Sequence, residues 1–579
     1  MLVSIPTQSG LPLRPGDFAT LTDALDYAAG GATGLSFHAL RGGHVGSLTY
    51  RALREDARAL ARRLLGAGLE RGERVAMLAD TSPDFVRAFF ASQYAGLVPT
   101  PLPLPPPLGG REGYILLIER LVRESRAAAL FAPAEILPWL APLAQQLGLK
   151  VFGTVADLSA VTPGEAEPVP SGPDDIAYLQ FSSGSTRHPA GVAVRQRAVM
   201  SNTSAIMRHG LKMRLGDRTM SWLPFYHDMG LVGFLLTPLA GQLSIDLLPT
   251  ADFARRPMLW LSILSDYRGT LSFSPSFGYE LCVRRRANAP AGLDLSAWRA
   301  AGLGGDMIRP GVLASFAQTF AASGFRAEAL VPSYGMAEAT LAISFAELDT
   351  GVRTDEIDLR RLELEGHALP ATAETVHRRE FVRCGAPLPG HELDIRDAAG
   401  TSLPDRQVGR ILVRGPSIML GYDGQPEKTA EVLSADGWLD TGDLGYRLES
   451  EVVITGRAKD LILINGRNVW PQDLEWSVEQ SVTGVRTGDV AAFSIDEDGE
   501  EQVVVLIEAR GVTEPDARER LKAEVAGLLR ARHGLESCVV LVPAGSLPQT
   551  SSGKLSRAWA RRKYLGGAYD PAAARQQVA

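Results

Sequence analysis

Apolar positions in the first third of the chain follow helical and strand periods in turn. Leu53, Leu60 and Leu64 recur at helical spacing, and Gly66 follows where a helix would end. The next apolar stretch, RVAMLAD, is typical of a short buried strand. Residues 50–80 therefore predict a helix, a turn and a strand.

The same unit repeats downstream. Ser82 offers a side-chain oxygen as an N-cap, Pro83 suits the first helical position, and the predicted helix runs to Tyr94. A helix at ERLVRESR, a strand at AALFA, a helix over 136–147 and a strand at KVFGT follow. This alternation predicts parallel sheets flanked by helices, hence an α/β fold.

Two breaks interrupt the pattern. The tract TPLPLPPPLGG predicts an extended surface connector, with a ligand for SH3-type domains as the alternative. Beyond Gly456, strand-like EQVVVLIEAR and helical ARERLKAEVAGLLRARH indicate a compact α+β unit. We therefore expect an N-terminal domain over 1–456 and a small C-terminal domain over 457–579.

Composition narrows the class of protein. Of 579 residues, 45% are hydrophobic and 22% charged, which is typical of a soluble globular protein. The net charge of -7 and the short, scattered basic runs argue against nucleic acid as a partner. Three cysteines without a CxxC pair predict neither a disulfide framework nor a zinc site. With no evident leader or membrane-spanning stretch, we expect a cytoplasmic protein.

The loop SSGSTRHPAG directly follows the strand-like IAYLQF. Its small residues would let backbone N–H groups approach an anion, and its hydroxyls add donors, so it predicts a phosphate-binding loop. A plain Gly/Ser-rich turn is the alternative. Because no lysine follows its glycines, the loop is not that of a P-loop NTPase. The candidate phosphate-binding residues are Ser182, Ser183, Gly184, Ser185, Thr186 and Arg187.

Five further motifs follow in order: SWLPFYHDMGL, PSYGMAEATL, GWLDTGDLGY, ITGRAKDLILINGRNVWPQDLE and LPQTSSGKLSR. Together with the loop, they resemble the adenylate-forming superfamily of acyl-CoA synthetases, luciferases and adenylation domains. Their sequences are most similar to those of the fatty acyl-AMP ligases. The resemblance extends from Thr49 to the C-terminal tail. The resemblance implies a large N-terminal domain with parallel-rich sheets and a small, mobile α+β C-terminal domain.

Three residues are candidates for catalysis. Lys554 would bridge the attacking carboxylate and the α-phosphate of ATP, and Glu338 offers a hard oxygen ligand for Mg²⁺. By resemblance, His227 lines and gates the carboxylate end of the acyl pocket and is not a metal ligand. Taken alone, a solvated lysine, a capped helix start and a core histidine would be the plainer interpretations.

The resemblance also implies the binding residues. Tyr334 offers an aromatic face to adenine, Asp443 a carboxylate to the ribose hydroxyls, and Arg457 a guanidinium to ribose or phosphate oxygen. Lys459 and Asp460 flank the expected interdomain hinge. The remaining nucleotide contacts are assigned to Gly304, Gly305, Asp306, Ser333, Gly335, Met336 and Ala337, and the acyl tunnel to His227, Met229, Phe234, Ser274, Phe277 and Met336.

Two departures from the superfamily pattern bear on the acyl acceptor. Arg187 and Ala190 stand where most members have glycine and lysine, which resembles the fatty acyl-AMP ligase version of the loop. The polar stretch 348–383 matches an insertion of those ligases that is thought to hinder transfer to coenzyme A. A charged surface excursion is the plainer interpretation of that stretch.

These observations favour one function over two alternatives. The protein would use ATP and Mg²⁺ to convert a fatty acid to acyl-AMP and pyrophosphate. It would then acylate the phosphopantetheine thiol of an acyl carrier protein, in lipid, polyketide or lipopeptide biosynthesis. A long-chain acyl-CoA synthetase and a non-catalytic adenylate-binding protein are the alternatives.

Overall fold

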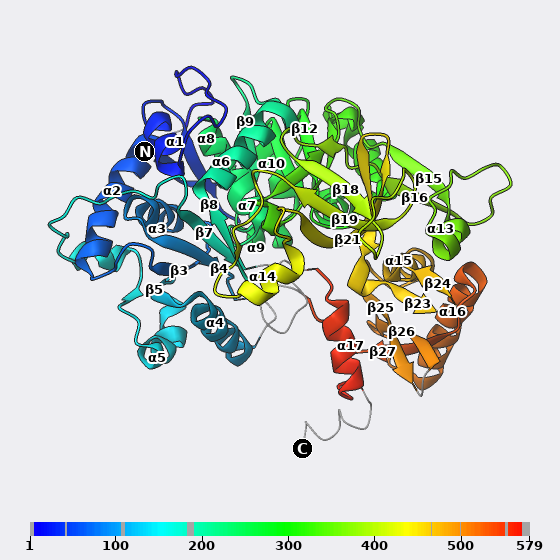
Figure 1. Ribbon diagram of the computed structural model, residues 1–579. Helices are drawn as coiled ribbons and strands as arrows, with labels where there is room; N and C mark the ends of the chain where they lie inside the picture. Colours follow the sequence, from blue (N-terminus) through cyan, green and yellow to red (C-terminus); the bar gives the residue numbers. More distant parts are fainter. Residues whose placement is uncertain are drawn as a thin grey trace.

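The computed structural model describes residues 5–40, 43–105, 110–181, 190–464, 466–497, 500–549 and 554–569. Figure 1 shows a large unit that contains most of the chain and a smaller C-terminal unit packed beneath one end of it. Parallel-rich sheets flanked by helices make up the large unit, which confirms the predicted α/β fold class.

The centre of the large unit is a nine-stranded sheet in the order β17-β14-β13-β12-β11-β9-β10-β1-β2. Its inner pairs are parallel, whereas β2, β14 and β17 join in antiparallel fashion at the two edges. The strands are β1 (Gly34–His38), β2 (His44–Thr49), β9 (Arg218–Ser221), β10 (Ser244–Leu247), β11 (Leu271–Ser274), β12 (Ala300–Leu303), β13 (Leu330–Gly335), β14 (Ala342–Phe345) and β17 (Ala386–Pro387).

Helices cover this sheet because their apolar faces need a partner. Their most deeply buried side chains join the strands in one continuous hydrophobic core. The helices are α1 (Leu21–Ala28), α6 (Gln196–Ala205), α8 (Thr237–Ala240), α9 (Thr250–Arg255), α10 (Met258–Asp266), α11 (Ser276–Arg284) and α12 (Pro310–Phe320).

A second, fully parallel sheet has the order β4-β3-β5-β6. It confirms the predicted helix and strand alternation, including the cap of α3, where the Ser82 hydroxyl accepts from the Phe85 N–H at 3.2 Å. The strands are β3 (Arg74–Leu78), β4 (Val98–Leu102), β5 (Ala127–Phe131) and β6 (Val151–Gly153), and the helices are α2 (Tyr50–Gly66), α3 (Pro83–Tyr94), α4 (Arg111–Ser125) and α5 (Leu137–Leu147).

The proline tract is only partly the connector that its composition predicts. Thr100 to Leu102 belong to β4, a buried strand that pairs in parallel with β3. Pro99 and Pro101 fit there because β4 lies at the edge of its sheet, where a missing N–H donor costs little. Residues 106–109 lie outside the described part of the chain.

Two smaller sheets also belong to the large unit. One is antiparallel and contains β18 (Glu392–Arg396), β19 (Gly409–Arg414), β21 (Leu439–Leu448) and β22 (Glu451–Arg457). The other contains β7 (Ile176–Phe181), β8 (Gly191–Arg195) and β20 (Gly421–Tyr422). Strand β7 leads directly into the predicted phosphate-binding loop.

The stretch 348–383 is more than a charged surface excursion. It forms the antiparallel pair β15 (Thr354–Asp358) and β16 (Arg378–Val382), with α13 (Leu359–Glu365) between them. Ile357, Leu362 and Phe381 pack with Tyr446 and Trp470 in a hydrophobic cluster of their own. This stretch therefore fills a corner between the two units, as Figure 1 shows on the side of α13 and β24 (Arg467–Val469).

The C-terminal unit has its own hydrophobic clusters, which accords with the compact α+β unit expected there. It contains β23 (Ile462–Ile464), β24 (Arg467–Val469), α15 (Pro471–Ser481), β25 (Val490–Glu497), β26 (Glu500–Glu508), α16 (Pro515–His533), β27 (Ser537–Val542) and α17 (Arg557–Leu565). Throughout the described residues of both units, none of the helices has the length and apolar character needed to cross a membrane.

Candidate active site

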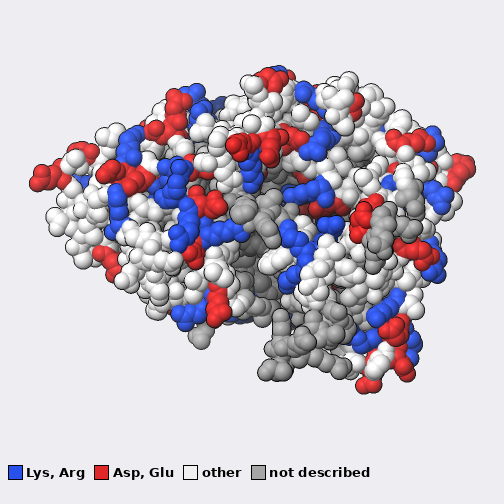
Figure 2. All heavy atoms as spheres, turned by 60° about the horizontal axis from the view of Figure 1, so that its bottom comes forward, with Lys and Arg blue, Asp and Glu red and all other residues white. Residues whose placement is uncertain are grey.

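A cavity of about 910 Å³ lies at the junction of the two units. It has a polar end, where residues from both units meet, and an apolar end inside the large unit. Figure 2 shows the recess between the units, with Lys and Arg side chains on both sides of it. Apart from residues 182–187, which lie outside the described residues, and Ser274, every predicted site residue lines this cavity.

Lys554 comes from the C-terminal unit and lies deep in the polar end. Its Nζ atom is 3.7 Å from the place where a Cβ on Gly305 would be. Burial lowers the pKa of Lys554, while the carboxylates of Asp228 and Asp306 raise it in part. The ammonium group thus lies within electrostatic range of two carboxylates.

Asp306 also belongs to this centre. Its carboxylate accepts from the Ser276 backbone N–H at 3.1 Å and from the Ser276 hydroxyl at 3.3 Å. Burial raises the pKa of Asp306 to about 6, against the opposing effect of Lys554. The side chain faces Lys554 and is fixed by the start of α11.

Glu338 lies in a short 3-10 turn (Ala337–Ala339) and is 8% exposed. Its Oε1 accepts a hydrogen bond from the Tyr422 hydroxyl at 2.9 Å. Burial raises the pKa of Glu338. Thr340, at a φ of 69°, closes the turn in the left-handed region, and its hydroxyl donates to the Ser417 carbonyl at 2.6 Å. The turn thus holds a nearly buried carboxylate against the cavity.

A hydrogen-bonded row connects three of the predicted nucleotide residues. The Tyr334 hydroxyl donates to Asp443 Oδ2 at 2.8 Å, and Arg457 Nε lies 3.3 Å from Asp443 Oδ1. Asp443 and Arg457 face each other because β21 and β22 pair in that register. Burial raises the pKa of Asp443, whereas Arg457 lowers it in part. An aromatic ring, a carboxylate and a guanidinium are thus side by side, a set of groups that could hold a nucleoside phosphate.

His227 caps the short helix α7 (Asp228–Leu231) at the boundary between the polar and apolar ends. Its Nδ1 lies 2.6 Å from Asp228 Oδ1. Burial alone would raise the pKa of Asp228, but His227 and Lys554 outweigh it, so the pKa is lowered. Gln180, at the end of β7, donates to the Tyr226 carbonyl at 3.1 Å and ties this segment to the strand before the predicted loop.

Backbone shape explains two of the glycines. A Cβ on Gly335 would lie 1.8 Å from the Leu341 carbonyl oxygen, so the chain can only pass there as glycine. Gly305 has a φ of 80°, in the left-handed region that L-residues avoid. Ser333 donates to the Leu303 carbonyl at 2.7 Å and joins the ends of β12 and β13. Strand ends therefore shape this side of the cavity.

The apolar end lies within the large unit. Met229, Phe234, Phe277 and Met336 line it as predicted, whereas Ser274 does not. Ser274 is fully buried, and its hydroxyl donates to the Pro275 carbonyl at 2.8 Å. The wall also contains side chains that sequence reasoning did not single out: Ile206, Leu211, Phe273, Leu341, Ala342 and Phe345.

Lys459 and Asp460 lie in the short turn Ala458–Asp460 that joins the two units, and both face the cavity. Asp460 pairs with Arg557 at 3.1 Å, and Arg557 pairs with Glu475 at 2.7 Å. Burial lowers the pKa of Lys459. The turn has the position expected of a hinge, and the pairs around it fasten α17 to α15.

Contacts from the large unit, including its stretch 348–383, hold the C-terminal unit in place. Arg379 pairs with Asp473 at 2.6 Å, and its guanidinium lies 4.6 Å from the centroid of the Trp476 ring. Arg309 pairs with Glu479 at 3.0 Å and lies 4.9 Å from the same ring. Trp476 is therefore enclosed by two arginines of the large unit.

Sequence reasoning missed two polar residues of the centre, Asp228 and Tyr422. Asp228 follows His227 within SWLPFYHDMGL, so its place in the motif was an available signal. Tyr422 had no such signal, because it reaches Glu338 only through the pairing of β20 with β8. Ala190, at the end of the predicted loop, is buried.

Comparison with known proteins agrees with this geometry. The AMP-binding enzyme family matches residues 30–423. The chain belongs to this family of enzymes. A Caulobacter vibrioides protein named "Putative acyl-CoA synthetase" is 53% identical over 98% of this chain and 99% of its own length.

Two further matches have names that refer to ligases of fatty acids or fatty acyl groups. The medium-chain fatty acid acyl-carrier-protein ligase JamA of Moorena producens is 34% identical over 97% of this chain and 98% of its own. A solved structure from studies of fatty acyl-adenylate ligases of E. coli and L. pneumophila has a TM-score of 0.91. It is 43% identical and covers 96% of this chain and 99% of its own. The resemblance to fatty acyl-AMP ligases is thereby confirmed.

Proposed function

We propose that the protein joins a fatty acid to AMP and then passes the acyl group to an acyl carrier protein. In the first step, a carboxylate oxygen attacks the α-phosphorus of ATP, and pyrophosphate leaves. In the second, the phosphopantetheine thiol attacks the acyl carbonyl, a thioester forms, and AMP leaves with the bonding electrons. One observation carries the proposal: a single cavity joins a polar end, which contains Lys554, to an apolar end.

The first step needs positive charge where negative charges come together. Lys554 provides it beside Gly305, and His227 lies at the boundary with the apolar end. A carboxylate whose alkyl chain occupies the apolar end would therefore reach Lys554. The row of Tyr334, Asp443 and Arg457 would hold the nucleoside on the other side.

Glu338 fits the role of a Mg²⁺ ligand. Mg²⁺ binds through one or two carboxylates, substrate phosphates and several waters rather than an all-protein cage. Among the described residues, no group of three or more His, Cys, Asp or Glu side chains could hold a metal. The bound ion would neutralise charge on the departing pyrophosphate, and Tyr422 would keep the Glu338 carboxylate in place.

The choice of acceptor is supported by the name of JamA, an acyl-carrier-protein ligase, and by the packing of the insertion between the units. We propose two domains, 1–456 and 457–579, with rotation of the second about Lys459 and Asp460 between the two steps. The insertion, through α13 and Arg379, would restrain that rotation. A carrier would supply, through its tethered arm, the effective concentration that a free thiol lacks.

The test is to incubate the full chain with ATP, Mg²⁺ and a series of fatty acids. Acyl-AMP and pyrophosphate are expected with no acceptor present. Added holo acyl carrier protein should yield acyl thioester much faster than coenzyme A at equal concentration. Rapid acyl-CoA formation would assign the protein to the acyl-CoA synthetases, as the name of the Caulobacter relative suggests for that protein.

A further inference from the structure

Four arginines gather where one side of the cavity reaches the surface. Arg284, Arg285 and Arg286 follow one another at the C-terminal end of α11, and Arg486 lies in the loop between α15 and β25. All four are exposed. Arg284, Arg285 and Arg486 line a second cavity of about 310 Å³ together with Leu281. We call these four residues the arginine rim.

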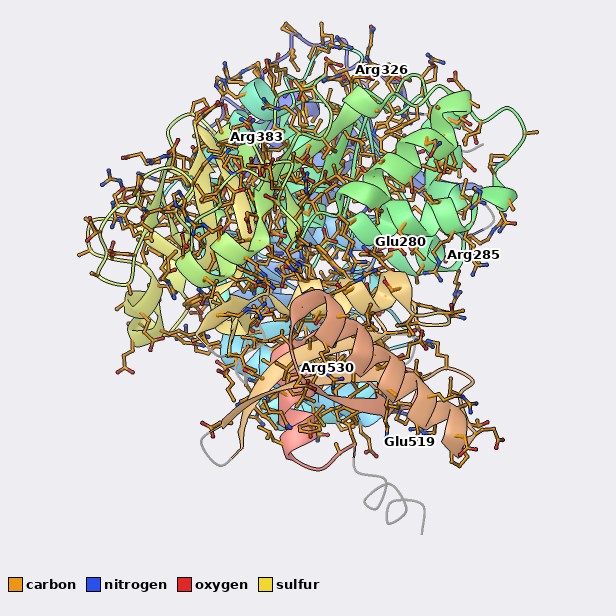
Figure 3. All side chains as sticks on the ribbon, turned by 90° about the vertical axis from the view of Figure 1, so that its right-hand side faces the viewer. Glu280, Arg285, Arg326, Arg383, Glu519 and Arg530 are labelled. Atoms are coloured by element: carbon orange, nitrogen blue, oxygen red, sulfur yellow. The ribbon has the colours of Figure 1, made fainter. Side chains whose placement is uncertain are left out.

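The arginine rim adjoins the active-site cavity. Leu281 and Arg284 line both cavities, so the smaller one opens beside the larger. The two units touch there, because the Thr487 hydroxyl donates to Glu280 Oε1 at 2.6 Å. Figure 3 shows Glu280 and Arg285 on the large unit directly above the C-terminal unit. The rim thus lies at the edge of the active-site cavity, where the two units meet.

Ordinary structural roles account for only part of this charge. One arginine at a helix C-terminus complements the helix dipole, but the effect fades within a turn and does not reach the separate loop of Arg486. Within the described residues, no carboxylate forms an ion pair with Arg284, Arg285 or Arg486.

Other arginines on the same side of the molecule are paired. Arg326 lies 3.1 Å from Asp349, and Arg530 lies within 2.5 Å of Glu536. Like charges that lie close together repel one another. A cluster of unpaired arginines beside a cavity therefore favours the binding of an anionic partner.

We infer that the arginine rim is the docking surface for the acidic face of the acyl carrier protein. The inference rests on the proposed function, because it names the place where that acceptor meets the enzyme. The phosphopantetheine arm is joined to its carrier by a phosphodiester, so an anion always accompanies the thiol. A carrier with carboxylates around that phosphodiester would match the rim while its arm entered the cavity.

Arg486 makes the inference specific to the arrangement described. Arg284, Arg285 and Arg286 belong to the large unit and would stay beside the cavity if the C-terminal unit rotated. Arg486 would leave them. Docking in this arrangement therefore requires both Arg285 and Arg486, neither of which lines the main cavity among its described residues.

The test compares the full-length protein with the double variant Arg285→Glu and Arg486→Glu. The acceptors are an acidic holo acyl carrier protein, coenzyme A and free pantetheine. Acyl-AMP formation is expected to stay within about twofold. Transfer to the carrier should fall about tenfold or more in kcat/KM at low salt, chiefly through KM, and the difference should shrink as salt screens the charges. Transfer to free pantetheine should not change.

The control is Arg520→Glu with Arg532→Glu, two exposed arginines on α16, which contributes no described residue to the cavity wall. Equal carrier transfer by the Arg285 and Arg486 variant and by the unchanged protein would overturn the inference and leave the proposed function standing. An equal loss with coenzyme A would overturn it too, by assigning the rim to phosphate groups alone.

Failure of the unchanged protein to acylate any carrier, despite forming acyl-AMP, would refute the proposed transfer before any variant is compared, and the inference with it. If the charge reversal abolished acyl-AMP formation, Arg285→Gln with Arg486→Gln would replace it. The neutral pair should show a smaller loss of the same kind, and no loss would overturn the inference.

Discussion

The two ends of the active-site cavity are built in different ways. The polar end brings together Lys554 of the C-terminal unit and Glu338, Asp443 and Asp306 of the large unit. Its charges contact one another, as in the pair of Asp443 and Arg457. The apolar end contains side chains of one unit only, packed as part of the main core.

This difference suggests that the polar end governs the chemical step and the apolar end governs which fatty acid is accepted. Charged groups that face each other in a buried site are costly unless a substrate completes their partners, so changes there should act on the chemical step. Apolar walls are formed by packing alone, so changes there should alter which chain fits and leave the chemistry intact. Substitutions at the two ends should therefore differ in which of these two properties they change.

Replacement of Lys554 by alanine should have the largest effect. It removes the positive charge that faces the reacting groups, so acyl-AMP formation should fall by about 10³-fold or more while ATP binding stays nearly intact. Pyrophosphate exchange and calorimetric ATP titration measure the two. Lys563→Ala, on α17 beyond the cavity, is the control. Unchanged exchange in Lys554→Ala would refute the assigned role.

Glu338→Gln keeps the shape of the side chain and removes its charge. The rate of acyl-AMP formation should fall about 10- to 100-fold, and the Mg²⁺ concentration for half-maximal rate should rise, because the ion loses a carboxylate. A Mg²⁺ titration of the rate measures both. Glu431→Gln, at another part of the cavity wall, should behave like the unchanged protein. An unaltered Mg²⁺ requirement in Glu338→Gln would contradict its role.

Phe345→Ala should change selection without loss of chemistry. Phe345 lines the apolar end, and its ring centroid lies 6.1 Å from that of Phe273, so truncation would lengthen the acyl space. The preferred fatty acid should lengthen by about two carbons, with little change in kcat for that acid. A chain-length series of kcat/KM values measures this. Phe345→Leu should shift it less, and an unchanged profile would place the tunnel end elsewhere.

The same separation explains what the sequence could predict. Motif residues of the polar end, such as Asp443 and Lys554, lie in short glycine-rich segments whose composition indicates binding. The apolar wall has no comparable signal in the sequence. Phe273 and Phe345 are of the same residue type as many side chains of the hydrophobic core, so the sequence does not distinguish them. Ser274 is the opposite case, because it was assigned to the acyl tunnel but does not line the cavity. It lies at the end of a strand near the site, and its side chain is buried in the core instead.

Long-range pairing is the other limit of local patterns. Helices and strands such as α2 and β3 were predictable because their periods and caps are local. The strand Val98–Leu102 could not be predicted in this way. It forms because the segment pairs with β3 at the edge of the sheet, which is a long-range contact. The contact of Arg379 with Asp473 likewise requires two segments almost a hundred residues apart to meet.

Asp306→Asn should give the smallest effect, measured as stability against pH in the free enzyme. The pKa of Asp306 is raised from 3.8 to about 6 by burial, so between these values the native state binds more protons than the unfolded state. Stability therefore falls as pH rises through this window, and the penalty is complete above it. Asparagine removes the charge, so at pH 7.5 the apparent Tm should rise by about 2 °C or more, and the gain should shrink towards pH 4.

In a Lys554→Met background the gain at pH 7.5 should be larger, because the opposing ammonium is gone. A gain that is independent of pH would show that the Asp306 carboxyl is not the group responsible.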